Sequence, residues 1–136
     1  MARVTGLYCS LLLVGLQGCK VMQGVPGCEQ FRTGKFAMQA EPDGVRYIVT
    51  RDDSIQTEHN LQTGKIVRMK VNWTSPCSYE LTLLSTNEFV TDPSQEYAKT
   101  HPLQVKIIKR AKDYYIFTAK MEGVNLRMKD TLRVSL

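Results

Sequence analysis

The segment "KIVRMKVNW" (residues 65–73) alternates apolar and polar side chains. The apolar set would share one face of an extended strand, and it consists of Val67, Met69, Val71 and Trp73. The intervening positions are polar or charged. Because a one-residue shift would move every apolar side chain to the opposite face, the segment predicts a strand with a firmly set register and one face against a hydrophobic core.

The same two-residue period recurs from Phe31 onward, in segments separated by short turns. These segments are "KFAMQA" (35–40), "VRYIVTRDD" (45–53), "SIQTEHN" (54–60), "CSYELTLL" (77–84), "LQVKIIKR" (103–110), "YYIFTAK" (114–120) and "LRMKDTLRVSL" (126–136). Most connections are too short for a parallel crossover, so successive strands should pair antiparallel. The exception is residues 87–102, where Asp92 as N-cap and Pro93 at the first helical position predict one short helix.

The predicted fold is therefore all-β: an antiparallel meander of about eight short strands that closes into a small barrel. Two packed sheets are the alternative, but closure removes exposed strand edges and favours the barrel. A barrel of this size holds its own side chains or one small ligand. The residues expected to face the interior or a ligand are Phe36, Val67, Met69, Val71, Trp73, Tyr79, Leu81, Tyr115 and Phe117.

The N-terminus has the features of an export signal. Behind Arg3, residues 4–16 form an uncharged run rich in Leu and Val. This run is too short to span a bilayer and fits the apolar core of a signal peptide. It ends in "LQGC", with Leu three positions before a cysteine and a small residue directly before it, the pattern of a bacterial lipobox. A plain secretory signal that contains a cysteine is the alternative.

This pattern divides the chain into a lipoprotein signal peptide (1–18), a tether (19–27) and a barrel domain (28–136). The thiol of Cys19 would receive a diacylglyceryl group, and the new amino terminus would be acylated. Several acyl chains together make a stable membrane anchor. We therefore expect a protein of the cell envelope, anchored to the periplasmic face or the outer surface of the outer membrane.

The four cysteines allow three connectivities. Cys9 leaves with the signal peptide and Cys19 carries lipid, so Cys28 and Cys77 remain in an oxidising compartment. A disulfide between them is expected. Two cysteines and two dispersed histidines do not supply the clustered ligands of a zinc site, so no metal is expected.

The segments "CEQFRTGKF" (28–36), "RDDSIQTEH" (51–59) and "VNWTSPCSYEL" (71–81) occur in this order. They resemble a group of small envelope lipoproteins from Bacteroidetes such as Flavobacterium, and the resemblance extends to about residue 108. The two cysteines of that group fall on Cys28 and Cys77, which supports the disulfide. The group has no established activity. Some members bear the label DNA topoisomerase IV, which nothing in this short, exported chain supports.

The start of the first strand, Thr33-Gly34-Lys35-Phe36, also resembles the Gly-x-Trp start of lipocalins, with Phe36 in the place of Trp. This resemblance agrees with the barrel. The sequences Asp53-Ser54-Ile55 and Asp130-Thr131-Leu132 resemble a short O-glycosylation pattern of secreted Bacteroidetes proteins, and the glycosylation of Ser54 and Thr131 stays open.

The sequence holds no convergent set of catalytic residues. Glu58 and His59 are adjacent, so a strand would point them to opposite faces. Asp52 and Asp53 fit turn chemistry, and the motifs G-x-S-x-G and H-E-x-x-H and a phosphate-binding glycine loop are missing from the sequence. The formal net charge of +5 fits a solvated surface. We expect neither an enzyme nor a cofactor, and no nucleic-acid partner.

The expected function is that of a lipid-anchored envelope protein whose barrel binds a small apolar ligand or another envelope component. The first alternative is a purely structural or interaction barrel with a filled core, and an enzyme is the remote alternative. An interior cavity of about 300 Å³ or more would distinguish the ligand-binding barrel from the filled one.

Overall fold

The computed structural model describes residues 27–40, 44–88 and 92–135 of the 136-residue chain. Its elements are η1 (Cys28–Phe31), β1 (Gly34–Ala40), β2 (Val45–Arg51), β3 (Ile55–Asn60), β4 (Ile66–Ser75), β5 (Ser78–Thr86), α1 (Pro93–Thr100), β6 (Leu103–Arg110), β7 (Tyr114–Met121) and β8 (Leu126–Val134). The predicted signal peptide, the lipid site at Cys19 and all of the predicted tether except Gly27 lie outside the described residues.

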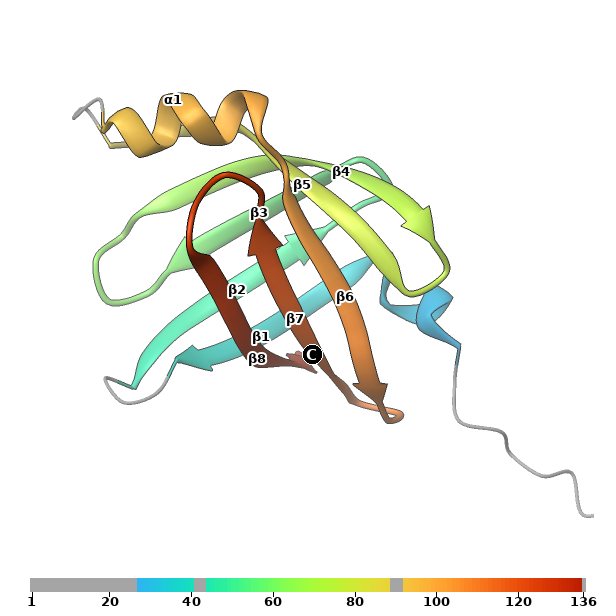
Figure 1. Cartoon of the computed structure of the whole chain (residues 1–136). Coiled ribbons are helices and arrows are strands. Elements are labelled where there is room, and N and C mark those ends of the chain that lie inside the picture. Colours follow the sequence, from blue (N-terminus) through green and yellow to red (C-terminus); the bar gives the residue numbers. More distant parts are fainter. Residues whose placement is uncertain (1–26, 41–43, 89–91, 136) are drawn as a thin grey trace, which may run out of the picture.

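The eight strands form a closed antiparallel barrel in which each strand pairs with its neighbour in sequence (Figure 1). The prediction of an all-β meander that closes into a small barrel is therefore confirmed. Closure itself is short: among the described residues, β1 pairs with β8 through Phe36 with Val134 and Ala37 with Arg133, and the Ser135 N–H donates to the Lys35 carbonyl at 2.8 Å. The barrel is thus joined firmly at one end of these two strands and not at the other.

Short polar side chains build the turns. At the β3–β4 turn, Asn60 Oδ1 accepts the N–H groups of Gln62 and Thr63. The backbone carbonyl of Asn60 accepts the N–H of Gly64, whose φ of 75° favours glycine. Between β2 and β3, the Asp52 carboxylate accepts the N–H groups of Ser54 at 2.9 Å and Ile55 at 2.8 Å. These hydrogen bonds, Ser54 first, lower the pKa of Asp52. The carboxylate shapes a turn, as the sequence predicts.

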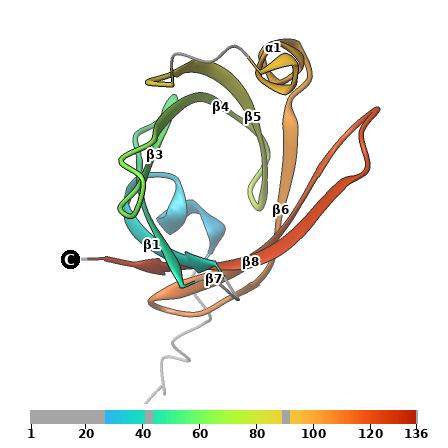
Figure 2. The same cartoon turned by 90° about the vertical axis from the view of Figure 1, so that its left-hand side faces the viewer.

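The helix α1 lies outside the barrel wall, where Figure 2 shows it end-on beside β5 and β6. The Asp92 carboxylate accepts the Ser94 N–H at 2.9 Å and Pro93 is the first helical residue, as the sequence predicts. None of its residues is buried. The Tyr97 hydroxyl donates to the Glu122 carbonyl at 2.7 Å and so ties the helix to the β7–β8 turn.

The cross-strand register collects the apolar side chains on the inner face. Val67 of β4 pairs with Glu58 of β3. On its other side, β4 pairs with β5 through Met69 with Leu83, Val71 with Leu81 and Trp73 with Tyr79. The core within is rich in aromatic side chains, and Phe31 and Tyr115 have no exposed surface. Burial of these rings supplies the main stabilisation of a barrel this small.

Candidate functional site

The barrel has two unlike ends. The closed end contains η1, the β4–β5 turn and the β6–β7 turn. The open end contains the β1–β2, β3–β4 and β7–β8 hairpins. Figure 2 looks into the barrel from the open end. The difference between the ends decides which of them can meet a ligand.

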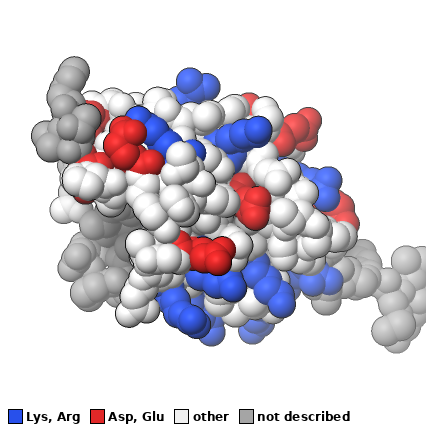
Figure 3. Space-filling model, turned by 45° about the horizontal axis from the view of Figure 1, so that its top comes forward, with Lys and Arg blue, Asp and Glu red and all other residues white. Residues whose placement is uncertain are grey.

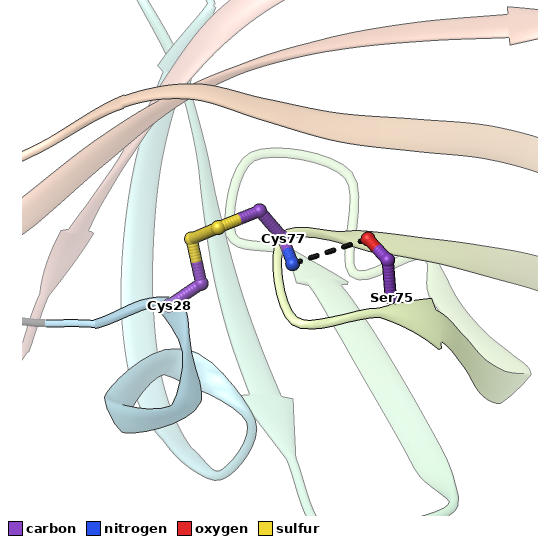
Figure 4. Close-up of a disulfide and its surroundings, with 3 residues drawn as sticks. All are labelled: Cys28, Ser75 and Cys77. Atoms are coloured by element: carbon purple, nitrogen blue, oxygen red, sulfur yellow. Dashed lines mark hydrogen bonds between the residues drawn. A yellow bond between two sulfur atoms is a disulfide. The ribbon is translucent and has the colours of Figure 1, made fainter.

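An aromatic residue and a disulfide seal the closed end. The Phe31 ring of η1 is fully buried, with its centroid 4.8 Å from that of Tyr115. Cys28 at the start of η1 is bonded to Cys77 in the β4–β5 turn, with Cα atoms 5.2 Å apart (Figure 4). The Cys77 N–H also donates to the Ser75 hydroxyl at 3.3 Å. The predicted disulfide is confirmed, and it holds η1 across this end.

A buried guanidinium fills the space beneath η1. Arg51, on the inner face of β2, is only 4% exposed. Its three nitrogens donate hydrogen bonds at 2.8–3.0 Å to Gln56 Oε1, the Phe31 carbonyl and the hydroxyls of Tyr79 and Tyr115. Burial raises the pKa of Tyr79 well above its usual value, so this phenol stays neutral at physiological pH. The cation is therefore satisfied by neutral acceptors that hold the closed end together.

A carboxyl group faces the interior farther along β3. Gln56 Nε2 donates to Glu58 Oε1 at 2.7 Å, which extends the polar chain from Arg51 toward the open end. Burial raises the pKa of Glu58, and the Gln56 hydrogen bond and the Arg51 charge only partly counteract it. His59 lies on the outer face, paired with Ile66. Glu58 and His59 therefore lie on opposite faces of β3, as the sequence predicts.

Toward the open end, burial falls, and large apolar side chains share the inner face with the polar residues Glu58, Asn60 and Asp130. Met69 and Leu103 are half-buried against the core. On β8, Leu126 is 42% exposed and Met128 is 36% exposed, although Met128 pairs with the buried Ala119. Because β8 pairs with β1 only near the closed end, the edge of β8 toward the open end has no partner strand among the described residues. The open end thus exposes large apolar side chains that point toward the barrel axis.

All nine residues predicted to face the interior lie on the inner face. Six of them are buried: Phe36, Val71, Tyr79, Leu81, Tyr115 and Phe117. Three are half-buried: Val67, Met69 and Trp73. The first group packs mainly around the closed end, whereas Val67 and Met69 lie toward the open end.

Sequence reasoning missed the three buried polar residues, Arg51, Gln56 and Asn60, and the aromatic residue Phe31 that seals the end. The period that places Tyr47 and Val49 on the inner face also places Arg51 there, so a signal was present. It is easily missed because charged residues are rarely buried.

Within the described residues, no cluster of three or more His, Cys, Asp or Glu side chains could hold a metal ion. No helix in the same part of the chain is long and apolar enough to cross a membrane. The chain matches no known family model, no curated protein and no solved structure.

Proposed function

We propose that the chain is a lipid-anchored, non-enzymatic protein of the cell envelope whose barrel binds an apolar ligand at its open end. One observation carries the ligand-binding part: Leu126 and Met128 lie on the inner face and yet remain 42% and 36% exposed. The closed end is sealed by Phe31 and the disulfide. A ligand can therefore approach from one end only.

The physical drive for binding is the removal of this apolar surface from water, at about 25 cal/mol per Å². Two carboxyl groups of the inner face lie beside this surface: Glu58 pairs with the half-buried Val67, and Asp130 follows Met128 by two residues on β8. Such an arrangement, an apolar surface with a few polar groups, suits a lipid-like molecule or an acyl chain of another envelope component. The same end would serve either.

A lipophilic fluorescent probe, cis-parinaric acid, tests the binding. We expect the wild type to enhance its fluorescence and the variants Leu126→Glu and Met128→Glu to weaken binding at least tenfold. The matched control is Ile66→Glu, because Ile66 is 37% exposed at the same end but on the outer face. Equal loss in all three variants would contradict the proposal.

The anchoring part rests on the "LQGC" pattern and on the disulfide between Cys28 and Cys77, which suits an oxidising compartment. Replacing Cys19 by Ser should give an unlipidated protein that leaves the detergent phase on phase separation. A variant that still partitions like the wild type would place the anchor elsewhere.

A filled, purely structural barrel is the second candidate, and the Arg51 network favours it, because this network already occupies the closed end with side chains. The two candidates give different results in native mass spectrometry. A ligand-binding barrel retains small apolar molecules on purification from the envelope, and a filled barrel retains none.

A further inference from the structure

A groove of about 780 Å³ crosses the outer face of the barrel, whereas the open end's apolar surface lies on the inner face; Met128 belongs to both, with its backbone in the groove and its side chain on the inner face. Its floor is one row of residues paired directly across β5, β6, β7 and β8: Tyr79, Val105, Ala119 and Met128. The side chains of this row point into the barrel, so their backbones form the floor. The groove therefore runs across the strands and not along them.

Two rows of outward side chains form the walls of this groove. One wall consists of Ser78, Lys106, Thr118 and Lys129, and the other of Glu80, Gln104, Lys120 and Arg127. The Cα atoms of the two walls are two residues apart along each strand, so the groove is about 7 Å wide between them. From β5 to β8 the groove crosses three strand spacings, so it is about 14 Å long. Thr74 completes the lining beside β5. These dimensions suit a single extended chain.

The walls carry four cations and one carboxylate. Lys106, Lys120, Arg127 and Lys129 are all exposed. Among the described residues, the two ion pairs join Lys65 with Glu88 and Lys99 with Glu96, so neither involves the groove. Figure 3 shows Lys and Arg side chains gathered along the lower edge of the view. The groove is thus a site of concentrated positive charge that the described part of the protein does not neutralise.

We propose that this groove binds a linear anionic polysaccharide laid across the strands. Anionic groups would meet Lys106 and Lys129 on one wall and Lys120 and Arg127 on the other. The side chains of Ser78, Thr118, Thr74 and Gln104 would donate hydrogen bonds to sugar oxygens. The proposal is independent of the apolar ligand at the open end.

Other anionic partners fit the groove less well. The floor residues pair within the sheet, so their backbones offer no edge to which an acidic peptide could add as a strand. Among the described residues that line the groove, Tyr79 is the one aromatic; it is 2% exposed and points inward, so it offers nucleic-acid bases no ring on which to stack. A flat lipid surface cannot enter a concave groove about 7 Å wide between its Cα rows.

Titration calorimetry on the full-length protein in detergent micelles tests this, with hexagalacturonate and a heparin hexasaccharide as probes. We expect at least one probe to bind at about 0.05 M NaCl and to weaken strongly at about 0.5 M. The double variant Lys120→Glu/Arg127→Glu should lose at least tenfold in affinity. The control Arg68→Glu/Lys70→Glu changes the charge equally on exposed residues of β4 and should stay within twofold of the wild type.

Three results would overturn the proposal. The first is that neither hexasaccharide binds the wild type. The second is equal loss in the two double variants, which would make the effect one of overall charge. The third is that a hexaglutamate peptide, a thymidine oligonucleotide or phosphatidylglycerol vesicles bind as tightly as the sugar and lose affinity in the same groove variant.

Discussion

Replacing Arg51 by Met tests whether the buried guanidinium network holds the closed end together. The change removes the donor for Gln56 Oε1 and for the Phe31 carbonyl, whereas the Tyr79 and Tyr115 hydroxyls lie 3.3 Å apart and can bond to each other. Each buried acceptor left without a donor costs about 1–3 kcal/mol. Removing a buried cation recovers part of that cost. We expect a net loss of about 2–4 kcal/mol in the free energy of unfolding.

Urea denaturation measures this loss. With a slope of about 2 kcal/mol per M, the midpoint should fall by about 1–2 M. Arg68→Met, on the exposed face of β4, is the control and should stay within about 0.5 kcal/mol of the wild type. Arg51→Lys should also be destabilised, because an ammonium cannot reproduce the planar fork of donors. If Arg51→Met matched or exceeded the stability of the wild type, the network would not be what stabilises the closed end.

Three further predictions concern other parts of the barrel. Replacing both Cys28 and Cys77 by Ser opens a loop with a sequence separation of 49 and should lower the free energy of unfolding by about 4 kcal/mol. The urea midpoint measures this loss, and an unchanged midpoint would show that the disulfide does not stabilise the fold. Burial raises the pKa of Glu58 above 4.5, so the folded state holds a proton that the unfolded state releases, and stability falls as pH rises from about 4.5 through the raised pKa. Glu58→Gln should therefore melt above the wild type at neutral pH, with a difference that shrinks toward pH 4, and a difference independent of pH would refute this assignment. Asp92→Ala removes the hydrogen bond to the Ser94 N–H and should speed amide exchange several-fold within α1 while the global urea midpoint stays the same; exchange as slow as in the wild type would show that the cap is unimportant.

At the closed end, the alternation of apolar and polar residues predicted which side chains face the interior but not how deeply they are buried. Alternation along β4 predicted Val71 and Trp73 on the inner face, and the pairing of Trp73 with Tyr79 places them there. Trp73 is nevertheless only half-buried, with its ring centroid 4.6 Å from that of Tyr79 and the Arg32 guanidinium 5.0 Å above it. Alternation gives the face of a residue but not its depth, which depends on the strands that close around it.

The candidate open-end site was only partly predictable. Val67 and Met69 were expected inside, but Leu126 and Met128 were not singled out, although they alternate within the predicted last strand. Their exposure follows from where β8 leaves β1, and this depends on only two residue pairs between strands at opposite ends of the domain. No local sequence pattern specifies where the pairing between the first and last strands of the barrel ends.

The sequence by itself predicted the strands and the turns, because each depends on short-range rules: a two-residue period and a carboxylate that accepts nearby N–H groups. It also predicted the disulfide partners, as the two cysteines that remain beside the expected signal peptide and lipid site. Tertiary structure alone decided the rest. It placed the Arg51 cation among phenols that are 28 and 64 residues away in sequence. It also aligned Lys106, Lys120, Arg127 and Lys129 along one groove, because that alignment requires two successive registers, between β6 and β7 and between β7 and β8. Registers between distant strands are set by the closure of the whole barrel, since every strand must bury its own inner face against all the others.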